Sequence, residues 1–181
     1  MADRAYDREK LKALVHYVIW KAGSRPNFGA TKLYKIAWFS DARCFVLKGR
    51  SITGAPYIRQ EHGPIPRDGI IVRNELARAG LISQKKLPSF RGEAWSFRSM
   101  APPDPNVFEG YERAEIDWWI KHIDEDHTAT SISDESHDYG WEIAQTGEKL
   151  PFVSILAQRV REPNQEELAW ARTRARELSL P

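Results

Sequence analysis

The chain has 181 residues, of which 41% are hydrophobic and 29% charged, a composition that fits one soluble globular domain. A single cysteine, Cys44, excludes an intrachain disulfide. No stretch approaches the roughly 18 consecutive apolar residues that span a bilayer, and the charged N-terminus is unlike a signal peptide. We therefore expect a cytoplasmic protein that does not contact a membrane.

Charge is spread unevenly along the chain, although the net charge is only +2. Residues 1–100 hold 19 Lys and Arg against 8 Asp and Glu, a net of +11, whereas residues 112–149 hold 3 against 11, a net of −8. A basic half can bind nucleic acid or an acidic partner. Because the basic residues are scattered singly, we favour the alternative, in which the two halves fold together and compensate each other.

Two helices are predicted first. Residues 7–22 carry apolar residues at helical spacing on one face, with Asp7 as the expected N-cap and Gly23 as the expected end. A second helix is predicted from Thr31, as its cap, to about Leu47. Its apolar residues extend round more than one side, so we expect it to be the central helix of the core.

The connector over residues 51–69 is specified unusually tightly. It holds a turn at Thr53-Gly54, a strand over residues 57–61 and a corner at Gly63-Pro64-Ile65-Pro66. Glycine permits the turn of such a corner and proline fixes the direction of its exit. His62, beside the corner, is expected to be a structural residue.

A short helix and a hairpin follow the corner, so the predicted order of three helices and then a hairpin is that of a winged helix-turn-helix. Residues 67–79 are predicted to form a short helix that ends at Gly80, and residues 81–83 and 94–97 are predicted to pair as a β-hairpin. Three prolines within residues 101–106 then break the chain.

The acidic part of the chain is predicted to be helical again. Asn106 is the expected cap of a helix over residues 109–126. Ser131 and Asp134 resemble the capping box of another short helix. Residues 147–157 are expected to be extended or irregular.

A last helix is predicted from Asn164, which forms a capping-box pattern with Glu167, to about Leu178. It is rich in Arg and Glu with few apolar anchors, which suits docking on a partner. The whole pattern predicts a mainly α (α+β) fold. We expect one compact helical domain over residues 1–158, with a small hairpin or short sheet, and a C-terminal helix within residues 159–181.

Residues able to carry chemistry give no specific sign of an enzyme. Cys44 lies on an apolar helix stripe and is expected to be a small buried hydrophobic residue. Adjacent helix residues point about 100° apart, so Ser136-His137-Asp138 does not predict a catalytic triad. His122 and His127, at i and i+5, share no helix face, and Asp126 adds one ligand at most, so no metal site is predicted. We expect no cofactor and no small-molecule substrate.

Two adjacent tryptophans mark the acidic helix. Trp118 and Trp119 cannot both point fully into the core, so one of them is expected near the surface. An exposed tryptophan is a candidate anchor for a protein partner.

Two ordered motifs resemble the signature of the Panacea domain, also called the SocA-like antitoxin domain. The first begins with "TKLYKIAWFSD" and runs through the turn "ITG" and a strand to the corner "GPIP". The second, "ISDESHDYGW", resembles L-S-x-x-S-H-x-x-x-x-W, with isoleucine in place of leucine and a shorter spacing before tryptophan. The matching residues are Lys32, Leu33, Lys35, Ile36, Phe39, Asp41, Ile52, Thr53, Gly54, Tyr57, Gly63, Pro64, Ile65, Pro66, Ile132, Ser133, Ser136, His137 and Trp141.

The resemblance covers about residues 10–155 and implies a mostly helical domain with a small β element. It implies an antitoxin that neutralises a toxin encoded beside it, chiefly by direct protein contact. In the SocA case it also implies delivery of the toxin to a protease, and some members of the family are phage-associated. The resemblance assigns no catalytic residue and does not identify the toxin.

Two other functions stay open. A DNA-binding regulator would use the helix over residues 67–79, with Arg67, Arg73 and Arg78 facing operator DNA, although Arg73 lies well round from the other two. Many antitoxins repress their own operon, so this function is compatible with the first. An enzyme that uses His137 is the third alternative.

Overall fold

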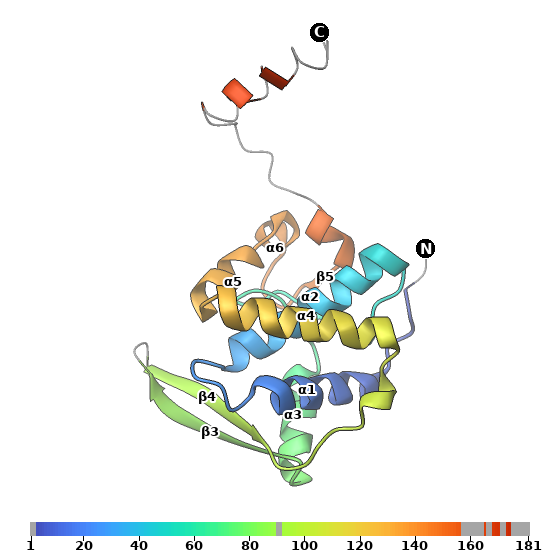
Figure 1. Ribbon diagram of the computed structural model, residues 1–181, viewed down its shortest axis with the longest axis vertical. Coiled ribbons are helices and arrows are strands. Elements are labelled where there is room, and N and C mark those ends of the chain that lie inside the picture. Colours follow the sequence, from blue (N-terminus) through green and yellow to red (C-terminus); the bar gives the residue numbers. More distant parts are fainter. Residues whose placement is uncertain (1–2, 90–91, 157–164, 166–167, 171–172, 175–181) are drawn as a thin grey trace.

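The computed structural model describes residues 3–89, 92–156, 165, 168–170 and 173–174 (Figure 1). They form a mainly helical structure with two small antiparallel sheets, which confirms the expected α+β class. The helices are α1 (Arg8–Ala22), α2 (Ala30–Lys48), α3 (Gly69–Arg78), α4 (Gly110–Asp126), α5 (Ala129–Glu135) and α6 (Tyr139–Ile143), with 3₁₀ turns η1 (Pro105–Val107) and η2 (Phe152–Leu156). The strands are β1 (Tyr57–Ile58), β2 (Ile65–Pro66), β3 (Ile82–Ser89), β4 (Gly92–Ser99) and β5 (Lys149–Leu150).

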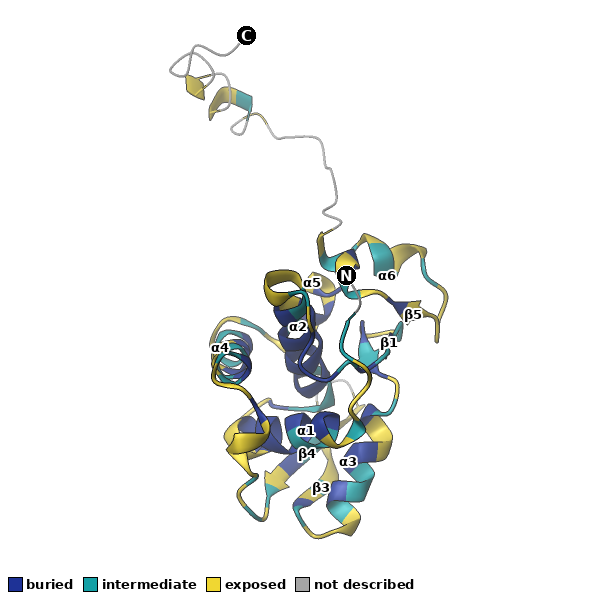
Figure 2. Cartoon of the chain, turned by 90° about the vertical axis from the view of Figure 1, so that its right-hand side faces the viewer, coloured by how far each residue is buried: buried dark blue, intermediate teal, exposed yellow. Residues whose placement is uncertain are grey.

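The core is built around α2, which Figure 2 shows buried along most of its length. Helices α1, α4 and α5 and the turn η2 pack against it. Trp38 of α2 is fully buried, and its ring lies 5.1 Å from that of Tyr57 and 5.6 Å from that of Phe152. Burying one side chain of this size contributes roughly 1.5–3 kcal/mol. The wide apolar stripe thus predicted the central helix correctly.

Strand β1 is the middle of a three-stranded sheet, with β2 and β5 antiparallel on either side. Tyr57 stands opposite Pro66 in β2 and opposite Leu150 in β5. The strand ends at Ile58, earlier than predicted, because the Gly63 backbone N–H donates to the Gln60 carbonyl and bends the chain into the corner. Neither β2, which contains a proline, nor the short β5 was predicted from the sequence.

The second sheet is the predicted hairpin, formed by β3 and β4. Its register runs from Ile82 opposite Ser99 to Ser89 opposite Gly92, so the hairpin is longer than the two runs that predicted it. Of its described residues, Ile82 and Phe97 are the buried ones. Most of the exposed remainder is polar, so an alternation of apolar and polar residues does not mark the full length of the two strands.

Helix starts differ in part from the prediction. Asp7 caps α1 as expected, since its carboxylate accepts a hydrogen bond from the Lys10 backbone N–H (2.9 Å). The cap of α2 is Gly29 and not Thr31, because the chain enters the helical region before the threonine. Gly49 ends α2 in the left-handed conformation (φ 70°), as glycine does at many helix ends.

Two later caps are also placed differently. Glu109 caps α4 in a capping box with Glu112, so Asn106 does not cap it and lies in η1 instead. Thr128 caps α5, and Ser131 is the third residue of that capping box instead of the first. At α5 two good capping residues, Thr128 and Ser131, stand close together, whereas at α4 the reciprocal contact of Glu109 with Glu112 fixes the start.

The uneven charge of the sequence is compensated within the fold, as we favoured. Helix α4 crosses α2 and runs beside α1 (Figure 1), and its acidic residues meet basic residues from the N-terminal half. The pairs are Arg4 and Lys10 with Glu112, Lys21 with Asp117, Arg25 with Asp124, Arg43 with Glu115, and Arg50 with Glu109. These pairs compensate part of the charge asymmetry, because each places a basic residue of the N-terminal half beside an acidic residue of α4 or its cap.

Most of the predicted C-terminal helix, residues 164–178, lies outside the described residues. Among the described helices, none combines the length and the apolar character needed to cross a membrane.

Candidate functional site

One group of motif residues centres on Asp41, which is buried in α2. Its carboxylate accepts hydrogen bonds from the Thr53 backbone N–H (2.8 Å), the Thr53 hydroxyl (2.5 Å) and the Tyr57 hydroxyl (2.8 Å). Burial raises the pKa of Asp41 to about 6, and these donors only partly oppose the rise. Gly54 completes the turn with φ 65°, where a Cβ would lie 2.5 Å from the Arg4 carbonyl oxygen. The group fixes the turn and β1 onto α2.

A second group joins the two motifs at the corner. The Lys35 amine donates to the Pro64 carbonyl oxygen (3.1 Å). Gly63 has φ 91°, and a Cβ there would lie 2.2 Å from Ser136 Oγ and 2.5 Å from Lys35 Nζ. Residue 63 therefore favours glycine for two reasons: the backbone has positive φ, and there is no room for a Cβ. Lys35, Gly63 and Ser136, from three distant segments, meet at one point.

Lys35 is a basic residue in a buried position, where a charged side chain is unusual. The side chain is buried, and burial lowers its pKa to about 7. Within the described residues its hydrogen bond goes to a carbonyl oxygen and not to a carboxylate. Burial therefore favours the neutral form of the Lys35 amine.

The second motif packs against Arg59 and Gln60, the two residues that follow β1. The rings of His137 and Trp141 are stacked, with centroids 3.6 Å apart and planes 7° apart. The Trp141 indole N–H donates to the Gln60 carbonyl oxygen (3.0 Å), and the Arg59 guanidinium lies 4.1 Å from the Trp141 ring. Burial lowers the pKa of His137, and the nearby Lys35 cation lowers it further. The two motifs thus form one packed unit.

The polar side chains of the second motif make hydrogen bonds within the fold. The buried Ser136 hydroxyl donates to the Ser133 carbonyl oxygen (2.6 Å). His137 Nε2 lies 3.5 Å from the Ser133 hydroxyl, and the Asp138 carboxylate accepts from the Trp141 backbone N–H (2.8 Å). The three adjacent residues Ser136, His137 and Asp138 therefore hold separate contacts and do not act on one another as a triad would.

A cavity of about 250 Å³ lies beside the corner, with Tyr34, Lys35, Gln60 and His62 in its lining. This volume is below the roughly 300–1,000 Å³ typical of pockets for drug-sized ligands.

Other motif residues of α2 are part of the protein interior. Leu33 is fully buried, and burial lowers the pKa of Lys32.

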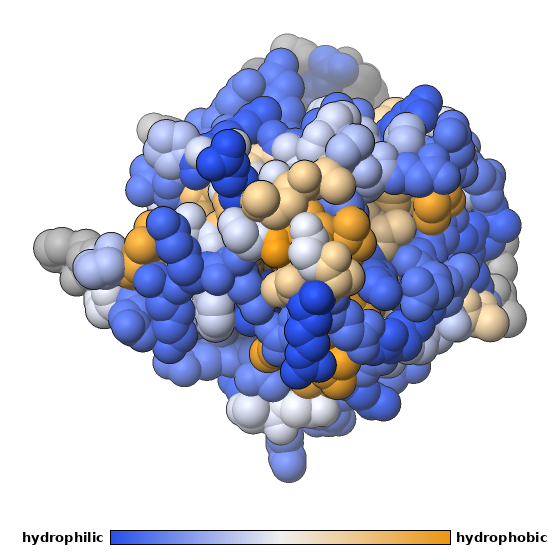
Figure 3. Space-filling view, turned by 90° about the horizontal axis from the view of Figure 1, so that it is seen from below, coloured by the Kyte–Doolittle hydropathy of each residue, from blue (hydrophilic) through white to orange (hydrophobic). Residues whose placement is uncertain are grey.

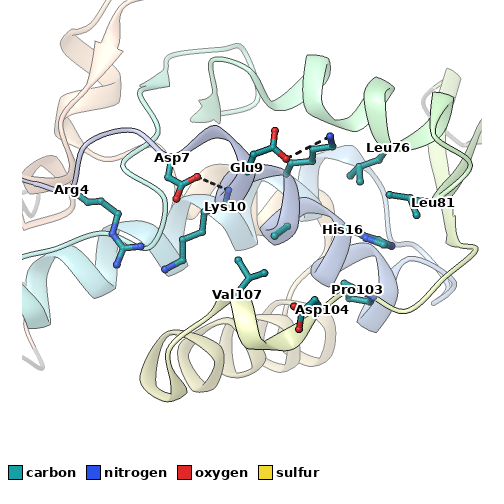
Figure 4. Close-up of a pocket in the computed structure, with 12 residues that line it drawn as sticks. Arg4, Asp7, Glu9, Lys10, His16, Leu76, Leu81, Pro103, Asp104 and Val107 are labelled. Carbon is teal, nitrogen blue, oxygen red and sulfur yellow. Dashed lines mark hydrogen bonds and ion pairs between the residues drawn. The ribbon is translucent and has the colours of Figure 1, made fainter.

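A larger cavity, of about 520 Å³, opens along α1 (Figure 4). Arg4 and Lys10 point to the same side of it in Figure 4, and both donate to the buried Glu112, at 3.0 and 2.7 Å. At its other end His16 Nε2 lies 3.1 Å from the Ala101 carbonyl oxygen. Burial lowers the pKa of His16. These charged and polar groups are thus used inside the protein, to tie α1 to α4 and to the end of the hairpin.

The adjacent tryptophans divide as expected. Trp119 is 7% exposed and stacks on Phe39, whereas Trp118 is 47% exposed. The Arg43 guanidinium lies 5.2 Å from the Trp118 ring. Trp118 therefore stays a candidate partner residue, and Trp119 is corrected to a core residue.

The arginines proposed for DNA are not arranged as a recognition surface. Arg73 is 3% exposed, with its guanidinium 4.4 Å from the Trp95 ring, so it packs between α3 and the hairpin. Arg67 precedes α3, which begins at Gly69, and its backbone N–H donates to a loop carbonyl. Arg67 and Arg78 are exposed. Arg73, which helical spacing already placed well round from the other two arginines, is buried and therefore not available to DNA.

The other residues singled out from the sequence are readily placed. Cys44 is buried, as expected, and burial raises the pKa of its thiol to about 12. His62 is exposed beside the corner.

Sequence reasoning missed the outer face of α3. Ile70 and Ile71 are 47% and 52% exposed, while Val72 and Leu76 of the same helix are buried. The signal was present as an apolar run, Ile70-Ile71-Val72, too long for one face of a short helix.

Comparisons with family models, with curated proteins and with solved structures find no match for this chain.

Proposed function

We propose that this protein is an antitoxin that neutralises a cognate toxin by direct protein contact. The observation that carries the proposal is the meeting of the two Panacea-like motifs in one packed unit. Lys35 and Gly63 of the first motif share a contact point with Ser136 of the second. Trp141 reaches the carbonyl of Gln60, just before the corner. Two motifs that matched by chance would not be expected to pack against each other in the fold. Their contact therefore supports the resemblance to the Panacea domain.

The outer face of α3 suits contact with a protein. Its centre is apolar, with Ile70 and Ile71 exposed, and the exposed Arg67 and Arg78 stand before and at the end of the helix. On the face seen from below, hydrophobic residues gather near the middle and hydrophilic residues lie around them (Figure 3). An apolar centre with a polar rim is typical of protein interfaces.

The same observations favour a protein partner over DNA. A recognition helix needs basic and polar side chains toward the phosphates and base edges. On α3 the middle arginine, Arg73, is buried, and two isoleucines take the outer positions. Lys10 and Lys21 of α1 and Arg43 of α2 are already paired with acidic residues of α4.

The test is co-expression with each flanking gene under inducible control in a bacterial host, with survivors counted. We expect one flanking gene to be toxic and this protein to restore growth and to co-purify with the gene product. Ile70→Asp and Ile71→Asp are expected to abolish rescue while the circular dichroism spectrum stays unchanged. Trp118→Ser is the comparison for the other exposed candidate, and its rescue is expected to be intact.

Flanking genes that are all harmless would overturn the antitoxin proposal. Rescue that is lost in Trp118→Ser and kept in both isoleucine variants would move the contact to α4. Binding of operator DNA with a steep salt dependence, together with no toxic neighbour, would favour the regulator instead.

A further inference from the structure

The junction of α4 and α5 gathers two histidines that the sequence spacing separates. Helix α4 ends at Asp126, and His127 has an extended backbone (φ −127°, ψ 142°). The chain therefore leaves the helix before the second histidine. His122 and His127 are not positions i and i+5 of one helix, so helical geometry does not keep their rings apart. The ring centroids of His122 and His127 lie 5.0 Å apart, with the planes at 77°.

Helix α5 adds a carboxylate to the pair. Glu135 Oε2 lies 3.4 Å from His127 Nε2. One ring nitrogen from each histidine and one carboxylate oxygen of Glu135 all lie within 4.8 Å of one another. Ligand atoms bound to one tetrahedral Zn²⁺ at about 2.0–2.1 Å are separated by roughly 3.3 Å. The His127–Glu135 distance is already close to this value, and the His122 nitrogen lies within 4.8 Å of both atoms.

The other nitrogen of each histidine is held by a neighbour. His122 Nδ1 lies 2.8 Å from the Asp126 carboxylate, and His127 Nδ1 lies 3.2 Å from the Ser131 hydroxyl. Ser131 Oγ is itself fixed by the capping box, where it accepts from the Thr128 backbone N–H (3.0 Å). With Nδ1 hydrogen-bonded, Nε2 is the nitrogen that can bind a metal. Metal-binding histidines are commonly oriented in this way.

We propose that His122, His127 and Glu135 bind one Zn²⁺ ion, with water as the fourth ligand. Two imidazoles and a carboxylate form a ligand set that zinc accepts, and hard cations such as Mg²⁺ prefer oxygen alone. The Asp126 carboxylate, 2.8 Å from His122 Nδ1, adds a negative charge beside the cluster, which attracts a cation. The bound ion ties the end of α4 to α5, next to the exposed Trp118, whose ring stacks on His122 at 4.7 Å.

The test is a calorimetric titration of the full chain with Zn²⁺ after treatment with EDTA and dialysis. We expect one ion per chain. Asp126→Asn, which changes the group that orients His122, is expected to weaken binding by about 10–100-fold. His127→Ala and the exposed Glu135→Gln are expected to weaken it further. His62→Ala removes an exposed histidine outside the cluster and is the matched control, with unchanged affinity.

A Co²⁺ titration gives an independent readout, because tetrahedral Co²⁺ absorbs strongly in the visible range and octahedral aqueous Co²⁺ does not. A visible spectrum that is present in the control and absent in Glu135→Gln would support the site. No binding by the wild-type chain, or equal binding by wild type, His127→Ala and Glu135→Gln, would overturn the proposal. The 3.4 Å contact would then be an ion pair of His127 with Glu135 and nothing more.

Discussion

Lys35→Met is the sharpest test of the corner, because it removes a buried cation and keeps most of the side-chain volume. The Lys35 amine is buried, and the partner that its hydrogen bond reaches is the Pro64 carbonyl oxygen. Desolvation by burial lowers the pKa from 10.5 to about 7. Folding of the wild-type chain therefore carries a penalty that methionine does not.

The size and the pH range of the penalty follow from the two pKa values. A fall in the pKa of Lys35 from 10.5 to about 7 corresponds to roughly 5 kcal/mol. In this range the unfolded chain binds more protons than the folded chain, so wild-type stability rises with pH. The penalty is complete below about pH 7 and disappears as pH rises to 10.5. Loss of the donor to Pro64 costs the variant about 1–3 kcal/mol at every pH.

The free energy of unfolding is to be measured by urea titration at pH 6.5 and pH 9.5, for wild type and variant. We expect Lys35→Met to be more stable than wild type by roughly 2–4 kcal/mol at pH 6.5. Its advantage should fall by roughly 3 kcal/mol at pH 9.5. Lys85→Met, at an exposed position on β3, is the control, and its difference from wild type should not change with pH.

A variant that is less stable than wild type by the same amount at both pH values would refute this reasoning. It would mean that Lys35 stays charged in the folded protein and that its interactions there outweigh its desolvation.

Two further predictions concern the motif residues. Gly63→Ala is expected to destabilise the fold by about 1–3 kcal/mol more than Gly80→Ala, because both glycines have positive φ but a Cβ at residue 63 alone meets Ser136 and Lys35. Equal losses in urea unfolding would show that crowding at the corner is not important. For Asp41, the raised folded pKa of about 6 makes the wild type lose roughly 3 kcal/mol as pH rises from about 4 to 7. The non-ionising Asp41→Asn variant should lack this loss, and parallel pH profiles of the two proteins would contradict the raised pKa.

Much of the fold followed from local patterns. The spacing of apolar residues predicted α1 and α4, and the width of the stripe on α2 predicted its central place. The positions of Gly80 and Gly63 predicted a helix end and a corner, because positive φ is a property of a single residue. Boundaries were less certain where several capping residues stood close together, as at Thr128 and Ser131.

The sequence by itself determined the α+β class, the order of the main helices and the hairpin, and the positions of the two motifs. Only the tertiary structure decided that Arg73 faces Trp95, and that Ile70 is exposed. Only it brought His127 and Glu135 together and paired the basic half with α4. Helix propensity and turn conformation depend on neighbours within a few residues, so a sequence reveals them. Burial, charge pairing and side-chain convergence depend on distances between segments far apart in the chain, and these exist only after packing.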